Sequence, residues 1–188
     1  RRDKAAVSMA EIDEAIDRVI AGLEKKNRVI NEQEREIVAY HEAGHAIVAE
    51  RVETADPVHK ISIIPRGVGA LGYTQQLPTD DRYLLQRQEL DDRIAVLLGG
   101  RAAEELVFNE TSTGAGNDLE RASEIARRMV GEFGMSDALG PVNLVGPRGP
   151  QFLDPRTQGG DGGGNAISEA TARVVDEEVR RVLNEAYT

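Results

Sequence analysis

The sequence of 188 residues contains neither cysteine nor tryptophan. Without thiolates, the chain forms no disulfides and no cysteine-ligated metal sites, so any metal must be held by His, Asp or Glu. Aromatic residues make up only 4% of the chain, against 40% for all hydrophobic residues. The core must therefore consist mainly of Leu, Ile, Val and Ala side chains.

Positive charge is also scarce, because 23 Lys and Arg face 33 Asp and Glu, which gives a net charge of -10. Such an acidic surface argues against nucleic-acid binding, which requires a basic footprint. There is no signal peptide and no apolar run near 20 residues, so we expect this segment not to span a membrane. Its abrupt start and its end within a helical pattern suggest a fragment of a larger protein.

Only three histidines are present, and two of them lie in the stretch AYHEAGHAIVAE, residues 39–50. Residues four apart share one face of a helix, so His41 and His45 can offer nitrogens to one metal ion. Glu42 is offset by one position and can reach a water on that metal as a general base. This pattern is typical of zinc peptidases, although two ordinary helical histidines would also produce it.

The surrounding pattern predicts a mainly helical chain with a small β-sheet. The strands are expected in VHKISIIP (58–65) and ALGYTQQLP (70–78), joined by a turn at 66–69. The expected helices cover residues 7–26, about 32–52, 79–108, 117–133 and 167–188. A Gly99–Gly100 pair inside the third helix is typical of a close-packing point.

A third protein ligand is needed, and spacing alone leaves three candidates: Glu104, Glu105 and Asp118. His59 is expected on a strand and is better interpreted as a strand residue than as a ligand. Asp118 also has an ordinary interpretation, because it or its neighbour Asn117 would cap the following helix well.

Five blocks, in this order and spacing, resemble the peptidase domain of the FtsH family of membrane-anchored, ATP-dependent zinc metalloproteases. They are HEAGHAIVA, LGGRAAEELVF, STGAGNDLERAS, GEFGMSDALGP and ISEATARVVDEEV. The resemblance covers nearly everything from about Val7 onward. It implies a zincin-like helical peptidase domain that binds one zinc ion per subunit.

Residue by residue, the resemblance assigns His41, His45 and Asp118 as zinc ligands and Glu42 as the catalytic glutamate. Glu104 and Glu105 then become supporting or helix-packing residues. In the family, the strand equivalent to GALGYTQQL borders the cleft, where an extended substrate can add by main-chain hydrogen bonds. The implied substrate-binding residues are Gly69, Ala70, Leu71, Gly72, Tyr73 and Thr74.

The resemblance also predicts the domain organisation. Residues 1–28 correspond to the end of the ATPase lid, and residues 29–188 to a C-terminally truncated peptidase domain. No phosphate-binding loop is present, so ATP would be used by an ATPase domain outside this sequence. Family members form six-membered rings, anchored by membrane helices, with this domain in the cytoplasm or in the organellar matrix or stroma.

The leading hypothesis is therefore a zinc endopeptidase domain acting on unfolded or membrane proteins. One alternative is a non-catalytic, ring-forming assembly module of the same fold, which the intact Glu42 argues against. Another is a zinc hydrolase with a different substrate class, which the block-by-block match argues against.

Overall fold

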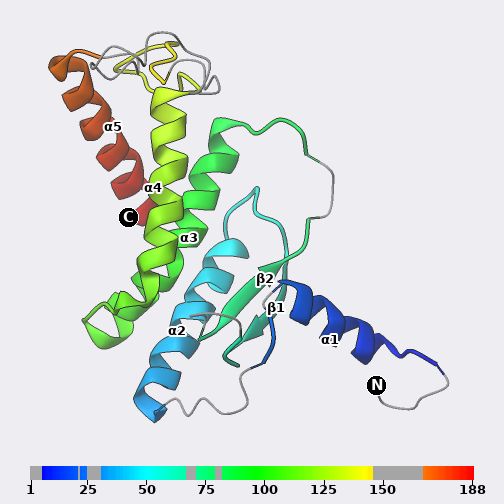
Figure 1. The fold of residues 1–188 in the computed structure, drawn as a ribbon. Helices are drawn as coiled ribbons and strands as arrows, with labels where there is room; N and C mark the ends of the chain where they lie inside the picture. Colours follow the sequence, from blue (N-terminus) through cyan, green and yellow to red (C-terminus); the bar gives the residue numbers. More distant parts are fainter. Residues whose placement is uncertain (1–5, 21, 25–30, 67–70, 79–81, 146–166) are drawn as a thin grey trace, which may run out of the picture.

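The computed structural model describes residues 6–20, 22–24, 31–66, 71–78, 82–145 and 167–188. The helices and strands in these ranges are α1 (Met9–Ile20), α2 (Glu32–Ala49), β1 (Val58–Ser62), β2 (Tyr73–Gln76), α3 (Arg87–Phe108), the short 3-10 helix η1 (Thr113–Ala115), α4 (Gly116–Gly131) and α5 (Glu169–Tyr187). Figure 1 shows α3, α4 and α5 packed together, with α2 lying between α3 and the small sheet. A mainly helical fold with a two-stranded sheet is thus confirmed for the described part of the chain.

The core between α3, α4 and α5 consists of aliphatic and small side chains, as the shortage of aromatic residues predicts. The largest apolar side chains in full burial are Ile94, Met129 and Val130. Burying a side chain of this size contributes roughly 1.5–3 kcal/mol to folding. The buried cluster comprises Leu90, Ile94, Leu98, Ala122, Ala126, Met129, Val130, Val179 and Val182. This cluster holds the two helices, α3 and α4, that face the histidines.

Helix α2 begins where the sequence predicts and ends earlier. The Asn31 side chain caps the helix by accepting a hydrogen bond of 2.7 Å from the Glu34 amide in the first turn. The helix ends at Ala49 and not near residue 52. Beyond it, the amide and hydroxyl of Thr54 donate to Asp92 of α3, at 3.0 and 2.6 Å. These bonds draw the chain away from the helix axis.

Helix α3 starts later than predicted. The expected start, Thr79, lies outside the described residues, and residues 82–86 are not helical. The helix begins at Arg87 because Gln86 adopts an extended conformation, with φ -86° and ψ 163°. The Gln86 amide donates to the Glu89 carboxylate at 2.6 Å, which satisfies a donor at the helix start.

The two predicted strands are confirmed as an antiparallel pair. In their register Ile61 lies opposite Thr74, and Ser62 lies opposite Tyr73. The residues joining the strands include 67–70, so most of the predicted turn lies outside the described residues. Side chains alternate along β2, so the faces of the strand differ: Thr74 contacts α2, whereas Tyr73 points the other way.

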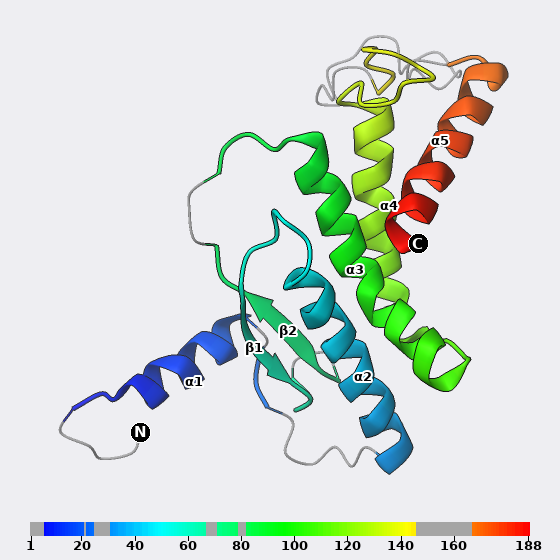
Figure 2. The ribbon, with the colours of Figure 1, turned by 180° about the vertical axis from the view of Figure 1, so that it is seen from behind.

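Helix α1 extends away from the rest of the molecule, as the view from behind in Figure 2 shows. It begins at Met9, close to the predicted start, where the Ser8 amide donates to the Glu11 carboxylate at 2.8 Å, and it ends at Ile20, before the predicted residue 26. The helix is tied to the sheet region by buried Asp17, which lies 2.5 Å from Lys60 Nζ and 3.4 Å from Arg66 Nη2. The lysine hydrogen bond is the main reason that the pKa of Asp17 is lowered.

Several apolar side chains of this N-terminal part are exposed, among them Val7, Met9, Val19 and Leu23. The division into a lid remnant (1–28) and a peptidase domain (29–188) remains a prediction. In the described ranges, no helix has both the length and the apolar character needed to cross a membrane.

Candidate metal centre

The centre is built on an unusually close crossing of α2 and α3. A Cβ atom on Gly44 would lie 2.3 Å from the carbonyl oxygen of Gly99, and one on Gly99 would lie 2.9 Å from the carbonyl oxygen of Gly44. Any larger residue would separate the two backbones. The close-packing interpretation of the glycine pair in α3 is therefore confirmed.

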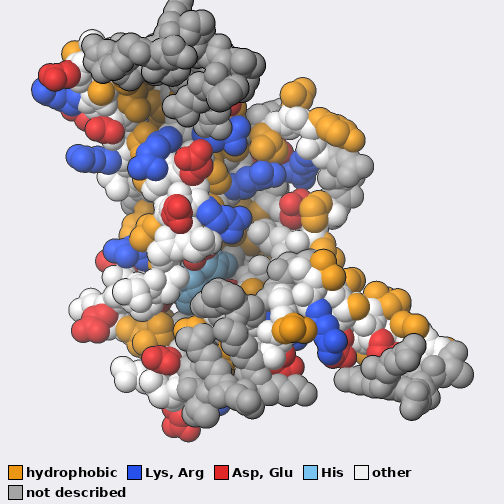
Figure 3. Space-filling view, in the orientation of Figure 1, with side chains coloured by type: hydrophobic (Ala, Val, Ile, Leu, Met, Phe, Trp, Pro, Cys, Tyr) orange, Lys and Arg blue, Asp and Glu red, His pale blue; other side chains and the backbone are white. Residues whose placement is uncertain are grey.

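The second glycine of the pair leaves space for the histidines themselves. A Cβ atom on Gly100 would lie 2.6 Å from both His41 Cε1 and His45 Nε2. The two imidazoles thus rest directly on the backbone of α3. Both side chains are buried, and on the face shown in Figure 3 histidine is visible in a hollow beside α4.

Each imidazole is oriented through its Nδ1 atom. His45 Nδ1 lies 2.7 Å from the main-chain oxygen of Val96, and His41 Nδ1 lies 2.7 Å from Glu104 Oε1. Both partners are acceptors, so each Nδ1 carries the hydrogen and donates it. The neutral rings therefore direct their Nε2 lone pairs toward each other.

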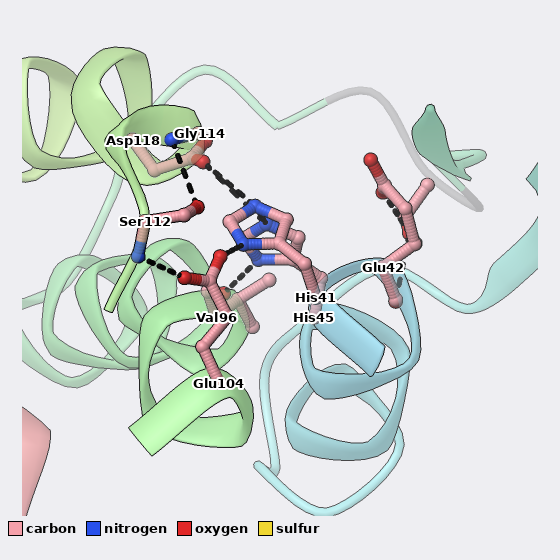
Figure 4. Close-up of polar contacts among 9 residues, drawn as sticks. His41, Glu42, His45, Val96, Glu104, Ser112, Gly114 and Asp118 are labelled. Atoms are coloured by element: carbon pink, nitrogen blue, oxygen red, sulfur yellow. Dashed lines mark hydrogen bonds and ion pairs between the residues drawn. The ribbon is translucent and has the colours of Figure 1, made fainter. Parts of the chain in front are cut away.

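Three electron-pair donors converge at the resulting point (Figure 4). The two Nε2 atoms are 3.0 Å apart, and Asp118 Oδ2 lies 3.3 Å from that of His41 and 3.5 Å from that of His45. Lone pairs at such distances repel unless a cation lies between them. Tetrahedral zinc with bonds of about 2.0–2.1 Å requires ligand atoms about 3.3 Å apart. The donor set therefore fits zinc in both chemistry and spacing.

Asp118 reaches this point from the first turn of α4. The sequence-based interpretation of Asn117 or Asp118 as the helix cap is wrong, because Ala115 occupies the cap position. A short 3-10 turn precedes α4, and Ser112 starts that turn by accepting a hydrogen bond of 3.1 Å from the Gly114 amide. The turn moves the helix start upstream, so that the aspartate faces the histidines.

Glu104 connects the histidines to this loop. It is 1% exposed; its Oε1 accepts from His41, and its Oε2 accepts from the Ser112 amide at 2.6 Å. One buried carboxylate thus fixes both an imidazole and the segment that carries Asp118. Glu105, by contrast, is exposed and accepts a hydrogen bond from Tyr187. Of the three candidates for the third ligand, Asp118 is the one grouped with both histidines.

The carboxylates and imidazoles of the centre shift one another's pKa values. Burial alone would lower the pKa of His41, but hydrogen bonds to Asp118 and Glu104 outweigh it, so the pKa is raised. Burial opposes ionisation of Asp118, yet the two imidazoles hold its pKa well below the usual range. The two carboxylates thus favour positive charge at His41.

Glu42 lies beside this cluster and outside its donor set. Its side chain is buried, and its Oε2 accepts a hydrogen bond of 2.7 Å from the Thr74 hydroxyl of β2. Burial raises the pKa of Glu42, and the bond from Thr74 opposes that shift. A Cβ atom on Gly72 would lie 2.8 Å from Glu42 Oε1.

The predicted substrate-binding residues are only partly described by the structure. Leu71, Gly72, Tyr73 and Thr74 precede or form β2, and two of them border Glu42. Gly69 and Ala70 lie outside the described residues. His59 is exposed on β1, which confirms its interpretation as a strand residue.

Two partners of the centre were missed by sequence reasoning: the main-chain oxygen of Val96 and the main-chain amide of Ser112. Backbone groups have no residue-type signature, so no motif could have indicated them. The Gly99–Gly100 pair was the available signal, because it marks where a side chain can approach the α3 backbone.

Two histidines of an HExxH helix, joined by a carboxylate as the third ligand, form the donor arrangement of zinc-dependent peptidases. A comparison with protein-family models matches residues 28–188 to peptidase family M41. The chain belongs to this family, and its resemblance to the FtsH proteases is confirmed.

Curated relatives carry the name ATP-dependent zinc metalloprotease FtsH. The relative from Syntrophobacter fumaroxidans is 55% identical over all of this chain, which covers 28% of that protein. The relative from Ralstonia pickettii is 56% identical over 99% of this chain, which covers 26% of that protein. The chain thus spans little more than a quarter of the length of these relatives.

The contact at Gly100 predicts a selective loss of metal. Gly100→Ala should displace both imidazoles and weaken zinc binding by about tenfold or more, as disruption of a metal site's supporting residues typically does. Gly116→Ala is the matched control, because a Cβ there has no neighbour within 4 Å. Zinc titration against a competing chelator measures both variants. Wild-type affinity in Gly100→Ala would contradict the close contact.

The raised pKa of His41 predicts how zinc affinity depends on pH. Zinc binds neutral imidazole and must displace the proton, so each displaced proton weakens binding about tenfold per pH unit of acidification. Because the pKa lies above its ordinary value, this loss should begin above about pH 6.5. Chelator competition from about pH 5 to 8 tests this, with His59→Gln as a control that keeps the profile. A flat profile would show that His41 is not a ligand.

Proposed function

We propose that this chain is the zinc-dependent endopeptidase domain of a membrane-anchored, ATP-dependent protease that degrades unfolded or membrane proteins. The observation that carries the proposal is the convergence of His41 Nε2, His45 Nε2 and Asp118 Oδ2 on one point beside Glu42. The two histidines and the aspartate would hold one zinc ion per subunit, and Glu42 would act as general base.

Zinc and the residues around it would divide the steps of peptide hydrolysis between them. When bound, zinc would lower the pKa of a water molecule and polarise the scissile carbonyl. Glu42 would accept the proton of the attacking water and later deliver it to the leaving amine. Burial raises the pKa of this carboxyl group, which strengthens it as a base. Glu104 and the Val96 carbonyl would keep the imidazoles in the tautomer that metal binding needs.

The proposed substrate is an extended polypeptide lying along residues 69–74. Gly72 and Thr74 face Glu42, so a chain added to this strand would run past the base. Main-chain pairing is largely independent of side-chain identity, which suits a protease for varied unfolded chains. The whole protein would assemble as a homo-hexamer, use ATP in a separate ATPase domain to pull substrates apart, and place this domain in the cytoplasm, matrix or stroma.

The alternative is a ring-forming assembly module without catalysis. Nothing in such a module would require an intact glutamate beside the histidines. Glu42 is buried and held by a hydrogen bond, and this favours the catalytic proposal.

Glu42→Gln tests the function directly. The amide is nearly isosteric but cannot accept the proton of water, so kcat should fall by about two to four orders of magnitude. Zinc content should stay near that of the wild type, because Glu42 is outside the donor set. The measurements are metal analysis and cleavage of a permanently unfolded polypeptide. Glu36→Gln, an exposed change on the same helix, should leave both unchanged. Retained turnover in Glu42→Gln would remove Glu42 as the base.

The third ligand is tested by three carboxylate-to-amide changes. Asp118→Asn removes the charge at the centre and should weaken zinc binding by at least about a hundredfold. Glu104→Gln removes a partner of His41 and should cost less, on the order of tenfold. Glu105→Gln, one position further along α3 and exposed, should match the wild type in chelator competition. A larger loss in Glu104→Gln than in Asp118→Asn would mean that the third ligand is misassigned.

A further inference from the structure

Both carboxylate oxygens of Glu42 lie against strand β2. Oε2 accepts from the Thr74 hydroxyl at 2.7 Å, and Oε1 faces Gly72, where a Cβ atom would lie 2.8 Å away. Residues two apart in a strand share one face, so both contacts come from the same side of β2. The position of the carboxylate therefore depends on contacts with Thr74 and Gly72 as well as on helix α2, which carries Glu42.

The Thr74 hydroxyl is itself fixed relative to α2. It lies 3.0 Å from the main-chain oxygen of Glu42 as well as 2.7 Å from its carboxylate. A hydroxyl has one hydrogen, and the shorter, charge-assisted bond to the carboxylate is the stronger of the two. The hydroxyl therefore donates to the carboxylate, and its closeness to the main-chain oxygen of the same residue restricts the rotamers in which the Glu42 side chain keeps this bond.

Glu42 needs such a restraint. It is buried, and among the described residues no lysine or arginine pairs with it. A glutamate side chain has several freely rotating bonds, and a misplacement of about 1 Å at a reacting group can cost roughly a hundredfold in rate. The Thr74 hydroxyl is the hydrogen-bond donor in the described structure that holds its carboxylate.

We propose that Thr74 is a positioning residue for the general base. The inference rests on the proposed function, in which Glu42 takes the proton of the attacking water. Thr74 would hold Oε2 and leave Oε1 free for that proton, while its own hydrogen stays in place throughout. Gly72 allows Oε1 to lie close to the backbone, because a Cβ atom at this position would be only 2.8 Å from it. The strand proposed to receive the substrate would in this way also set the position of the base.

The test compares Thr74→Val, which keeps the shape and removes the hydroxyl, with Thr74→Ser, which keeps the hydroxyl. In the zinc-loaded chain, Thr74→Val should lower kcat by about tenfold to a hundredfold on an unstructured fluorogenic peptide, with KM and zinc content nearly unchanged. Thr74→Ser should restore most of the lost kcat. Thr171→Val, on the distant helix α5, is the matched control and should behave as the wild type.

A second measurement reads the position of Glu42 without turnover. A peptidyl hydroxamate would chelate the zinc and donate a proton to Glu42, so its affinity should fall in Thr74→Val and recover in Thr74→Ser. A Thr74→Val variant that matches a zinc-binding, active wild type in kcat and hydroxamate affinity would overturn the inference and leave the proposed function standing. Equal losses in the valine and serine variants would also overturn it. A wild-type chain without zinc or turnover would overturn the proposed function, and this inference with it.

Discussion

The contact between the backbones of α2 and α3 is the constraint on which the metal centre depends. Because Gly44 and Gly99 lack side chains, the helices approach until main-chain atoms nearly touch. Only at this separation can an imidazole on one helix donate to a main-chain oxygen inside the other, as His45 does to Val96. That oxygen belongs to a helical peptide, so its position is as rigid as α3 itself. The ligand geometry is thereby set by regular backbone and not by a flexible loop.

Helix α3 also orients the second imidazole, through the side chain of Glu104. Its two oxygens are divided between an imidazole on α2 and the loop amide ahead of α4, so one side chain ties α2 to α3 and to the loop that leads into α4. Burying two carboxylates beside two imidazoles is costly unless positive charge compensates. The hydrogen bonds to Asp118 and Glu104 favour positive charge on His41, and its pKa is raised for this reason although burial opposes it. A divalent cation compensates more fully, so the polar cluster is arranged for a metal and is only partly balanced without one.

The two histidines of this centre could be predicted from sequence, whereas the third ligand could not be derived from spacing, for a physical reason. The i, i+4 spacing placed His41 and His45 on one face of α2, because helical periodicity is a local property. The third ligand could not be derived locally, since Asp118 depends on how a short 3-10 turn shifts the start of α4. Spacing therefore left three carboxylates open, and resemblance to a family was needed to select one. The start of α3 was misplaced for a similar reason, because residues 82–86 resemble the helix in composition but are not helical, and Gln86 is extended.

Strand β2 lies between helix α1 and the metal centre. Thr74 on one face of the strand, and Gly72 just before it, lie against Glu42. On the other face, Tyr73 lies close enough to Asp17 of α1 for that carboxylate to contribute to the raised pKa of the tyrosine, after burial. A two-stranded sheet has little stability of its own, so β2 depends on what packs against each face. Asp17 of α1 and the Glu42 carboxylate therefore lie on opposite sides of this short strand, and each helps to hold it in place.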